Sequence, residues 1–194
     1  MKQCYADLKK NYYSQNGEDG VLEGIFNKLG ITEGWFVDVG AWNGVYLSNT
    51  YNLVLKGWNG FEIEGNKVRA EKMMSTLPGY ITTVCRYVQP DDLDEILSSH
   101  YPPIPKSFDL LSIDIDSYDY WVWKNLKKYS PKVVVIEYNG QKDTGYIQPP
   151  DPNFKGQNGV SWDAMEKMAN EKGYELLCEV GNLIFVRKDL YDNL

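Results

Sequence analysis

The chain has 194 residues, of which 43% are hydrophobic. This length supports one well-filled core and is too short for two ordinary domains, so we expect a single domain over residues 1–194. The formal net charge of −7 disfavours a nucleic-acid partner, because binding to a phosphate backbone depends on clustered Lys and Arg. No apolar run reaches the about 18 residues of a membrane span, and the amino end lacks the apolar stretch of a signal peptide. The sequence therefore predicts a cytoplasmic protein without a membrane partner.

Helical patterns alternate with short apolar runs along the chain, which predicts a mostly parallel α/β sheet with helices on both faces. The first helix is expected to begin after Ser14 and to end near Leu29, and we interpret residues 1–34 as an N-terminal cap segment. Seven strands are predicted, at Trp35–Val39, Gly60–Glu64, Ile81–Val88, Leu110–Ile113, Val133–Glu137, Tyr174–Glu179 and Leu183–Val186. Further helices are predicted at Thr50–Lys56, Lys67–Leu77, Asp92–Ser98, Tyr120–Lys128 and Ser161–Lys172.

Two connections near the carboxyl end are informative. The last two predicted strands are joined only by Val180, Gly181 and Asn182. A parallel connection cannot be that short, so we expect an antiparallel strand pair at the end of the chain. The longest stretch without predicted structure is residues 139–160, which is rich in Gly, Pro, Asn and Gln. A loop of this length in a compact domain is usually functional or disordered.

The strongest functional signal is a hydrophobic strand that ends in an acid and a glycine turn, Phe36-Val-Asp-Val-Gly40-Ala-Trp-Asn-Gly44. Glycine lets the backbone turn tightly and approach a ligand. A dinucleotide-binding turn reads GxGxxG, whereas this turn reads GxxxG with Trp42 in place of the second glycine, where a bulky side chain would obstruct a pyrophosphate. The turn therefore favours a cofactor without phosphates, and Asp38 is placed to accept a hydrogen bond from an ammonium group. A lone turn of this kind without any ligand is the alternative.

A second acid strengthens the interpretation of a ligand site. The next predicted strand ends at Glu64, where an acid commonly accepts hydrogen bonds from both ribose hydroxyls of a nucleoside. Glu62 lies on the same face of that strand, and Glu64 is preferred because ligands of open α/β sheets bind at the carboxyl ends of the strands. The two acids and the glycine turn together predict a nucleoside site.

Further motifs accompany the turn: Tyr13-Ser-Gln-Asn-Gly-Glu-Asp19, Ser48-Asn-Thr50, Gly57-Trp-Asn-Gly60, Asp109-Leu-Leu-Ser-Ile-Asp-Ile-Asp116 and Gly181-Asn-Leu-Ile-Phe-Val-Arg187. Over nearly the whole chain, the set resembles the FkbM-like branch of class I S-adenosylmethionine-dependent methyltransferases. The resemblance implies a seven-stranded Rossmann-like sheet, S-adenosylmethionine as the methyl donor, and usually an oxygen of a sugar or natural product as the acceptor. It implies that the donor-binding positions are Asp38, Gly40, Ala41, Gly44 and Glu64. Many members carry an acid-Gly pair after the fourth strand, where this chain has Asp116-Ser117.

Acidic side chains cluster after the fourth and fifth predicted strands. Both strand ends should open onto the same crevice, where oxygen ligands suit a hard cation such as Mg²⁺, and the predicted ligands are Asp114, Glu137 and Asn139. The segment Asp-Ile-Asp-Ser-Tyr-Asp also resembles that of metal-dependent macrolide and aminocoumarin sugar O-methyltransferases, although those enzymes follow the fifth strand with paired aspartates. The alternative is that Asp114 or Asp116 hydrogen-bonds neighbouring turns and caps the helix expected near Tyr120.

Catalysis is not expected to use His100, the one histidine, because it precedes a proline-rich loop that we predict to lie at the surface. Proton removal from an acceptor hydroxyl would fall to Asp114 or Asp116, or to a metal that lowers the pKa of the hydroxyl. We interpret the chain as a methyltransferase for a small-molecule or saccharide acceptor, bound by residues 139–160 and by Tyr12–Asp19. A nicotinamide-dependent oxidoreductase and a non-catalytic nucleoside-binding protein of the same fold are the alternatives.

Overall fold

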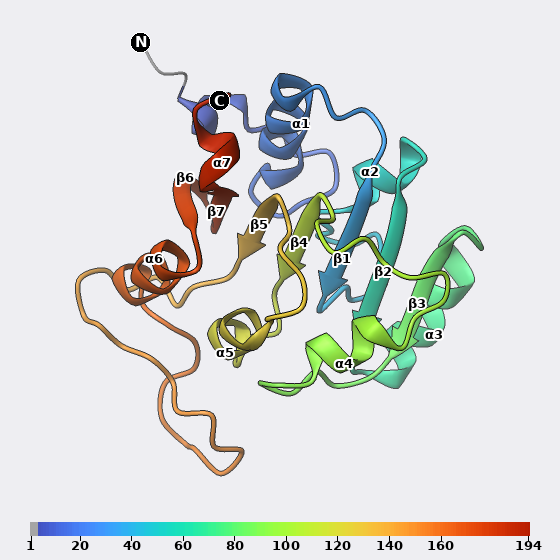
Figure 1. The fold of residues 1–194 in the computed structure, drawn as a ribbon. Coiled ribbons are helices and arrows are strands. Elements are labelled where there is room, and N and C mark those ends of the chain that lie inside the picture. The colour runs from blue at the N-terminus through green and yellow to red at the C-terminus, as the bar shows by residue number, and fades with distance from the viewer. Residues whose placement is uncertain (1–3) are drawn as a thin grey trace.

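A seven-stranded sheet forms the middle layer of the computed structural model, which describes residues 4–194 (Figure 1). Its strands are β1 (Trp35–Val39), β2 (Asn59–Glu64), β3 (Ile81–Cys85), β4 (Leu110–Ile113), β5 (Val133–Ile136), β6 (Tyr174–Val180) and β7 (Asn182–Arg187). They lie in the order β3-β2-β1-β4-β5-β7-β6. Strands β1 to β5 pair in parallel, and β7 is antiparallel to both β5 and β6. The predicted sheet, including its antiparallel end, is confirmed.

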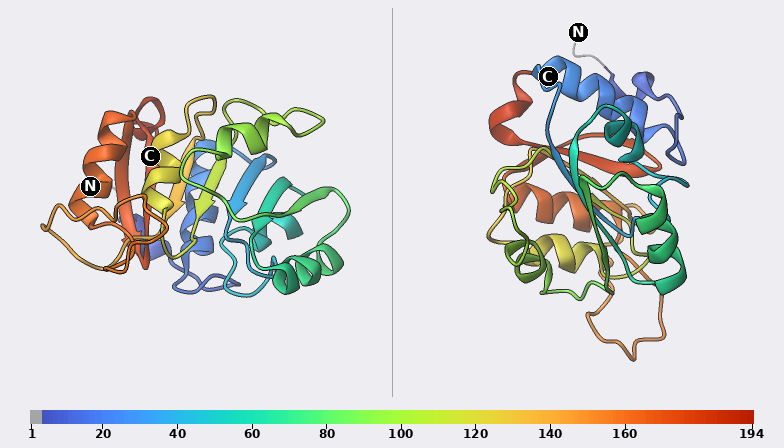
Figure 2. Two further views of the ribbon diagram at one scale, coloured as in Figure 1. Left: turned by 90° about the horizontal axis from the view of Figure 1, so that it is seen from below. Right: turned by 90° about the vertical axis from the view of Figure 1, so that its right-hand side faces the viewer.

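Helices cover both faces of the sheet, and the two layers can be followed in Figure 2. They are η1 (Tyr5–Leu8), α1 (Glu18–Leu29), α2 (Tyr51–Leu55), α3 (Lys67–Thr76), α4 (Leu93–Ser98), α5 (Asp119–Asn125), α6 (Trp162–Glu171) and α7 (Lys188–Tyr191). Helices α1, α2 and α3 bury the face that carries Phe36, whereas α4, α5 and α6 bury the face that carries Val37 and Val39. Because successive strand residues point to opposite faces, Asp38 and Glu62 lie on the α1–α3 side. No helix within residues 4–194 has the length and apolar composition to span a membrane.

The first helix begins later than the sequence indicates. It starts at Glu18, after Gly17 in a left-handed conformation with φ of 98°. Residues 15–17 therefore lie outside the helix. The Ser14 hydroxyl donates to Asp19 Oδ1 at 2.8 Å, and Asp19 Oδ2 accepts the Tyr13 backbone N–H at 2.7 Å. The buried carboxylate of Asp19 thus folds the preceding segment into a compact turn, and this local bonding competes with helix formation.

Two other predicted boundaries are wrong, one at the end of a strand and one at the end of a helix. The third strand ends at Cys85 instead of Val88, because the chain turns away from the sheet edge to line the cavity described below. The fifth helix spans Asp119–Asn125 and does not reach Lys128. The carboxylate of Asp94 accepts the backbone N–H groups of Lys127 and Lys128 at 2.8 and 2.9 Å, and these donors are therefore used outside the helix.

The long loop of residues 139–160 contains no helix or strand, and it extends away from the sheet (Figure 1). Its base is nevertheless held together. Ile147 and Val160 form an isolated antiparallel bridge, and the Asn139 backbone N–H donates to the Val160 carbonyl at 2.9 Å. The two ends of the loop are therefore fixed beside the carboxyl end of β5, while its tip projects outward.

Candidate active site

A cavity of about 730 Å³ opens at the carboxyl ends of β1, β2 and β4. Strand order reverses between β1 and β4, and ligands of open α/β sheets bind at such a switch point. The predicted site residues that line the cavity are Asp38, Gly40, Ala41, Glu64, Asp114, Asp116 and Glu137. Gly44 does not line the cavity and packs against Leu77 and Glu62. Asn139 lines an adjoining cavity of about 190 Å³, which shares Asp116 and Glu137 with the larger one.

Gly40 is required by the neighbouring strand. Its φ is 94°, and a Cβ atom built on it would lie 1.8 Å from the carbonyl oxygen of Asp114. The backbone after β1 therefore packs directly against the backbone after β4. The tight turn that the sequence predicts at Gly40 is confirmed, and the packing on Asp114 is a further requirement for glycine that the sequence does not indicate.

Asp38 sits at the floor of the cavity and is only 4% exposed. The Thr50 hydroxyl donates to Asp38 Oδ2 at 2.8 Å, and the Ser112 hydroxyl is a second hydrogen-bond partner of the carboxylate. Burial raises the pKa of Asp38 to about 6, with a smaller contribution from the nearby charge of Glu64. A cation in the cavity would favour the ionised form of this carboxyl.

Glu64 lines the cavity at the end of β2, as the sequence predicts, whereas Glu62 is buried beneath it. Both carboxylate oxygens of Glu64 accept backbone hydrogen bonds, from Trp42 N at 2.9 Å and from Asn66 N at 2.6 Å. Each oxygen retains a further lone pair. The carboxylate is thus held in a fixed orientation and remains able to accept hydrogen bonds from two hydroxyl groups.

Trp42 lies in the left-handed region with φ of 52°, and its indole lines the cavity with 40% of its surface exposed. The guanidinium of Arg69, from α3, lies 3.2 Å from the centre of the indole ring. Such a stack is a cation–π contact. The sequence singled out Trp42 but not Arg69, because no motif marks a residue in the first turn of a helix as a partner of the glycine turn.

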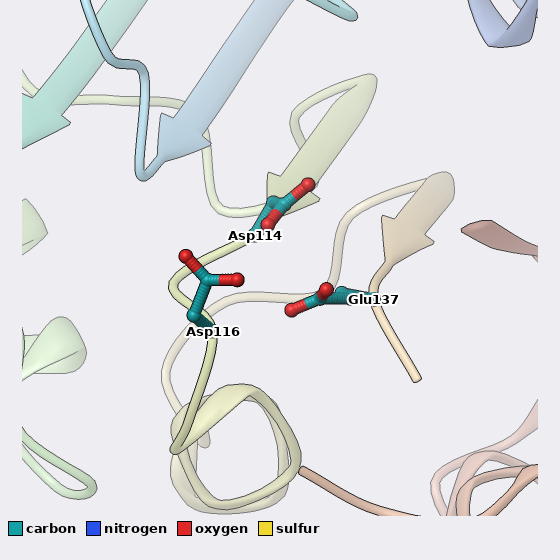
Figure 3. A group of neighbouring side chains, drawn as sticks. All are labelled: Asp114, Asp116 and Glu137. Atoms are coloured by element: carbon teal, nitrogen blue, oxygen red, sulfur yellow. The ribbon is translucent and has the colours of Figure 1, made fainter. Parts of the chain in front are cut away.

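Three carboxyl groups converge between the ends of β4 and β5 (Figure 3). One oxygen each from Asp114, Asp116 and Glu137 lies within 4.8 Å of the others. Asp119 accepts the backbone N–H groups of Ile115 and Ser117 at 2.9 and 3.0 Å. It therefore stabilises the turn after β4, a role that the sequence assigned to Asp114 or Asp116 as the alternative to metal binding.

The electrostatics of this group suit a cation. Burial, followed by neighbouring carboxylates, raises the pKa of Asp114 to about 7 and that of Glu137 to about 8. Oxygen donors of this type fit Mg²⁺. Asp116 joins Asp114 and Glu137 in this group. The predicted ligand Asn139 lines the adjoining cavity with Asp116 and Glu137, and its Oδ1 accepts the Gln141 backbone N–H at 3.1 Å.

The N-terminal segment forms the remaining wall. Gln15 and the buried Glu18 line the cavity, and a parallel bridge joins Ser14 to Leu47 in the loop after β1. His100 lies elsewhere, where its Nε2 is 2.8 Å from the Thr82 hydroxyl and its ring packs edge-on against Phe61. The expectation that catalysis does not use this histidine is consistent with that position.

Comparison with known proteins supports the fold assignment. No protein-family model matches the chain, and no curated protein sequence matches it. Solved structures do match. The N-terminal domain of EvdMO1 with S-adenosylhomocysteine bound has a TM-score of 0.56 at 11% identity, over 90% of this chain and 81% of that one. Magnesium protoporphyrin IX methyltransferase from Synechocystis PCC 6803, with S-adenosylmethionine bound, has a TM-score of 0.52 at 12% identity, over 88% and 77%.

A third structure, from Galdieria sulphuraria, is described as a candidate sarcosine dimethylglycine methyltransferase. It has a TM-score of 0.52 at 19% identity over 82% of this chain, which spans only 62% of that protein's length. At such low identity these likenesses establish the fold alone. The chain has the Rossmann-like fold of class I S-adenosylmethionine-dependent methyltransferases.

The packing at Gly40 predicts that Gly40→Ala destabilises the domain itself. The new Cβ would clash with the Asp114 carbonyl oxygen, and alanine would be strained in the left-handed conformation of residue 40. We expect a loss of about 1–3 kcal/mol in the free energy of unfolding. Denaturant unfolding measures it, with Gly79→Ala as the matched control because nothing lies within 4 Å of that position. A Gly40→Ala protein as stable as the wild type would contradict this packing argument.

The acidic group predicts binding of Mg²⁺ that strengthens as pH rises. Because the ionised carboxylates bind the cation and the pKa values of Asp114 and Glu137 are raised to about 7 and 8, affinity should increase between pH 6 and about pH 8. Calorimetric titration with MgCl₂ measures this, and Glu137→Gln should abolish the heat of binding. Asp143→Asn, at an exposed position, is the control. If Glu137→Gln binds Mg²⁺ as tightly as the wild type does, the metal does not bind at this group.

Proposed function

We propose that the chain is an S-adenosylmethionine-dependent methyltransferase of the FkbM-like branch that acts in the cytoplasm. The observation that carries the proposal is the convergence of Asp38, the Gly40 turn and Glu64 on one cavity at the switch point of the sheet. Two proteins of the same fold are described with S-adenosylhomocysteine or S-adenosylmethionine bound, which adds support for this class of ligand.

The donor half of the cavity matches the chemistry of S-adenosylmethionine. In our proposal Asp38 faces the ammonium group of the methionine part, and the two oxygens of Glu64 accept hydrogen bonds from the ribose hydroxyls. The donor also carries a positive sulfonium, which suits a cavity lined by six carboxyl groups, those of Glu18, Asp38, Glu64, Asp114, Asp116 and Glu137. The exposed indole of Trp42 fills the position where a dinucleotide would need a glycine.

The reaction that we propose is an in-line displacement. The bond between the methyl carbon and the sulfonium breaks as a bond to the acceptor oxygen forms, and S-adenosylhomocysteine leaves. The hydroxyl proton passes to Asp114 or Asp116, and the raised pKa of about 7 suits Asp114 to this role at neutral pH. Mg²⁺ is the alternative to a carboxylate base: held by Asp114, Asp116 and Glu137, it would lower the pKa of the acceptor hydroxyl, whose proton would then leave to solvent. The chain otherwise contributes alignment of the two reactants and exclusion of water.

The acceptor in this proposal is a small hydroxylated molecule such as a sugar or natural product. The smaller cavity adjoins the acidic group and is bounded by both ends of the long loop, through Asn139, Asn158 and Gly159. Nearby, the Gln141 amide donates to Gln157 Oε1 at 3.0 Å, so neutral amides occupy both arms of the loop. Such groups donate hydrogen bonds to hydroxyl oxygens and accept them from hydroxyl protons.

Calorimetric binding of S-adenosylhomocysteine tests the donor site. The wild type should bind, and affinity should rise as pH increases through about 6, because ionised Asp38 attracts the ligand ammonium. Glu64→Ala should weaken binding by about 1–3 kcal/mol, the cost of unpaired hydroxyl partners. Glu71→Ala, on the exposed side of α3, is the control. Absence of binding by a folded wild-type protein would overturn the proposed function, and binding without turnover across an acceptor screen would favour a binding-only role.

Shortening the long loop tests the acceptor site. Replacement of residues 149–157 by a Gly-Ser linker keeps the Ile147–Val160 bridge and the bond from Gly159 N to Gln148 Oε1. We expect S-adenosylhomocysteine affinity to be unchanged, because none of the replaced residues lines the large cavity. Methyl transfer to the acceptor found by screening should fall about tenfold or more, since misplaced reactants lose alignment. Undiminished transfer by the shortened protein would remove residues 149–157 from the acceptor site.

A further inference from the structure

Two buried carboxyl groups lie side by side beneath the donor cavity. Asp38 on β1 and Glu62 on β2 are register partners in the parallel ladder, and both face the α1–α3 side of the sheet. Glu62 is 0% exposed and does not line the cavity, whereas Asp38 does. Neither carboxyl forms an ion pair with a Lys or Arg anywhere in the described part of the chain. Two ionised groups at such a place would repel each other without compensation.

The hydroxyl of Thr50 joins the two acids, and its distances show which acid receives its proton. Thr50 Oγ1 is 2.8 Å from Asp38 Oδ2 but 3.5 Å from Glu62 Oε1. A hydroxyl has one proton and two lone pairs, so Thr50 donates to Asp38. Because Thr50 uses its proton on Asp38, a hydrogen can lie between Thr50 Oγ1 and Glu62 Oε1 only if the Glu62 carboxyl carries it, and the 3.5 Å contact is long for an O–H···O bond. Ser48 Oγ, at 3.1 Å, is the other neighbour of the Thr50 oxygen.

The second oxygen of Glu62 has surroundings that suit a neutral group. Glu62 Oε2 is buried and has no hydrogen-bond partner. It faces Gly44, where a Cβ atom would lie 3.0 Å from this oxygen and 2.8 Å from Leu77 Cδ1. An ionised oxygen there would have lost its hydration without gaining a donor, at a cost far above that of a neutral carbonyl. This contact also accounts for the glycine at position 44.

We propose that Glu62 is a positioning residue of the donor site: it remains a neutral carboxylic acid that donates to Thr50, fixes the Thr50 hydroxyl on Asp38, and leaves the single negative charge of the pair on Asp38. The role of that charge in attracting the donor ammonium rests on the proposed function, whereas the protonation state of Glu62 is independent of it. No assignment from the sequence motifs gives Glu62 a task, because Glu64 was preferred to it as the ribose ligand.

The ionisation order agrees with this arrangement. Burial, reinforced by the charge of Asp38, raises the pKa of Glu62 well above its usual range, whereas the pKa of Asp38 is about 6. The other ionisable groups that act on Asp38 are Glu64 at the end of β2 and Asp114 after β4, and both are acids. Asp38 therefore loses its proton first, and its charge then keeps the proton on Glu62.

Stability as a function of pH tests the neutral state without any ligand. Because the folded protein keeps a proton on Glu62 that the unfolded chain releases above about pH 4.3, this group lowers stability progressively as pH rises above that value. Glu62→Gln, which mimics the neutral acid, should match the wild type near pH 4 and become the more stable of the two by pH 8, with a higher unfolding temperature. The exposed Glu33→Gln should show no such divergence. A Glu62→Gln protein that is less stable than the wild type at pH 8 would overturn the proposal.

Binding of S-adenosylhomocysteine tests the positioning role. We expect Glu62→Gln to bind within about twofold of the wild type and to keep the change in affinity near pH 6, because Gln can still donate to Thr50. Glu62→Leu should lose about tenfold in affinity, since it cannot. Loss of the pH dependence in Glu62→Gln would show that Glu62 carries the charge and would contradict the proposal. Failure of the wild type to bind would count against the proposed function instead, and the stability comparison would still decide the state of Glu62. If neither variant folds, ¹³C NMR titration of glutamate-labelled protein decides it. Two carboxyl groups, those of Glu62 and Glu137, should remain protonated at pH 7 in the wild type, and one should remain so in Glu137→Gln. A Glu137→Gln protein with no protonated glutamate carboxyl at pH 7 would overturn the proposal.

Discussion

The structure depends on one electrostatic constraint: carboxyl groups from several parallel strands meet at one edge of the sheet with little positive charge among them. Parallel pairing of β2, β1, β4 and β5 brings their carboxyl ends together, so acids that are distant in sequence become neighbours. Burial then raises the pKa values of Asp38, Asp114 and Glu137 to about 6, 7 and 8. Such an arrangement is costly unless a cation compensates it. In our proposal, a cationic methyl donor and a divalent metal supply this compensation.

The glycine turn joins the strands on both sides of β1. Gly40 allows the backbone after β1 to touch the backbone after β4, and the Glu64 carboxylate accepts the backbone N–H of Trp42, two residues further along the turn. The same turn therefore connects both strands that flank β1. Trp42 keeps a left-handed conformation in this turn, which is uncommon for a bulky residue, and backbone strain of this kind is concentrated at functional sites.

Most of the fold could be predicted because its signals are local. Apolar runs and the three-residue connection at Val180–Asn182 predict a parallel sheet with an antiparallel end, and the strand order bears this out. One of the wrong boundaries depends on a side chain far along the chain. Asp94 ends the fifth helix early, through a sequence separation of more than thirty residues, and no helical pattern reports such a contact.

The site was predictable in part. Glu64 and Asp114 could be found because the end of a strand is visible in sequence, and both line the cavity. Three features were not visible: the packing of Gly40 on Asp114, the Arg69 stack on Trp42, and the pairing of Glu62 with Asp38 across the two strands. Each depends on which residues face one another across different elements. Sequence spacing within one element carries no information about that.

The most direct test of the account is a crystal structure of the chain with S-adenosylhomocysteine. We predict that the ribose hydroxyls lie within hydrogen-bond distance of the two Glu64 oxygens, and that the ligand ammonium lies beside Asp38, with the sulfur directed toward Asp114, Asp116 and Glu137. A nucleoside bound away from the Gly40 turn, or with its ribose remote from Glu64, would contradict the central claim.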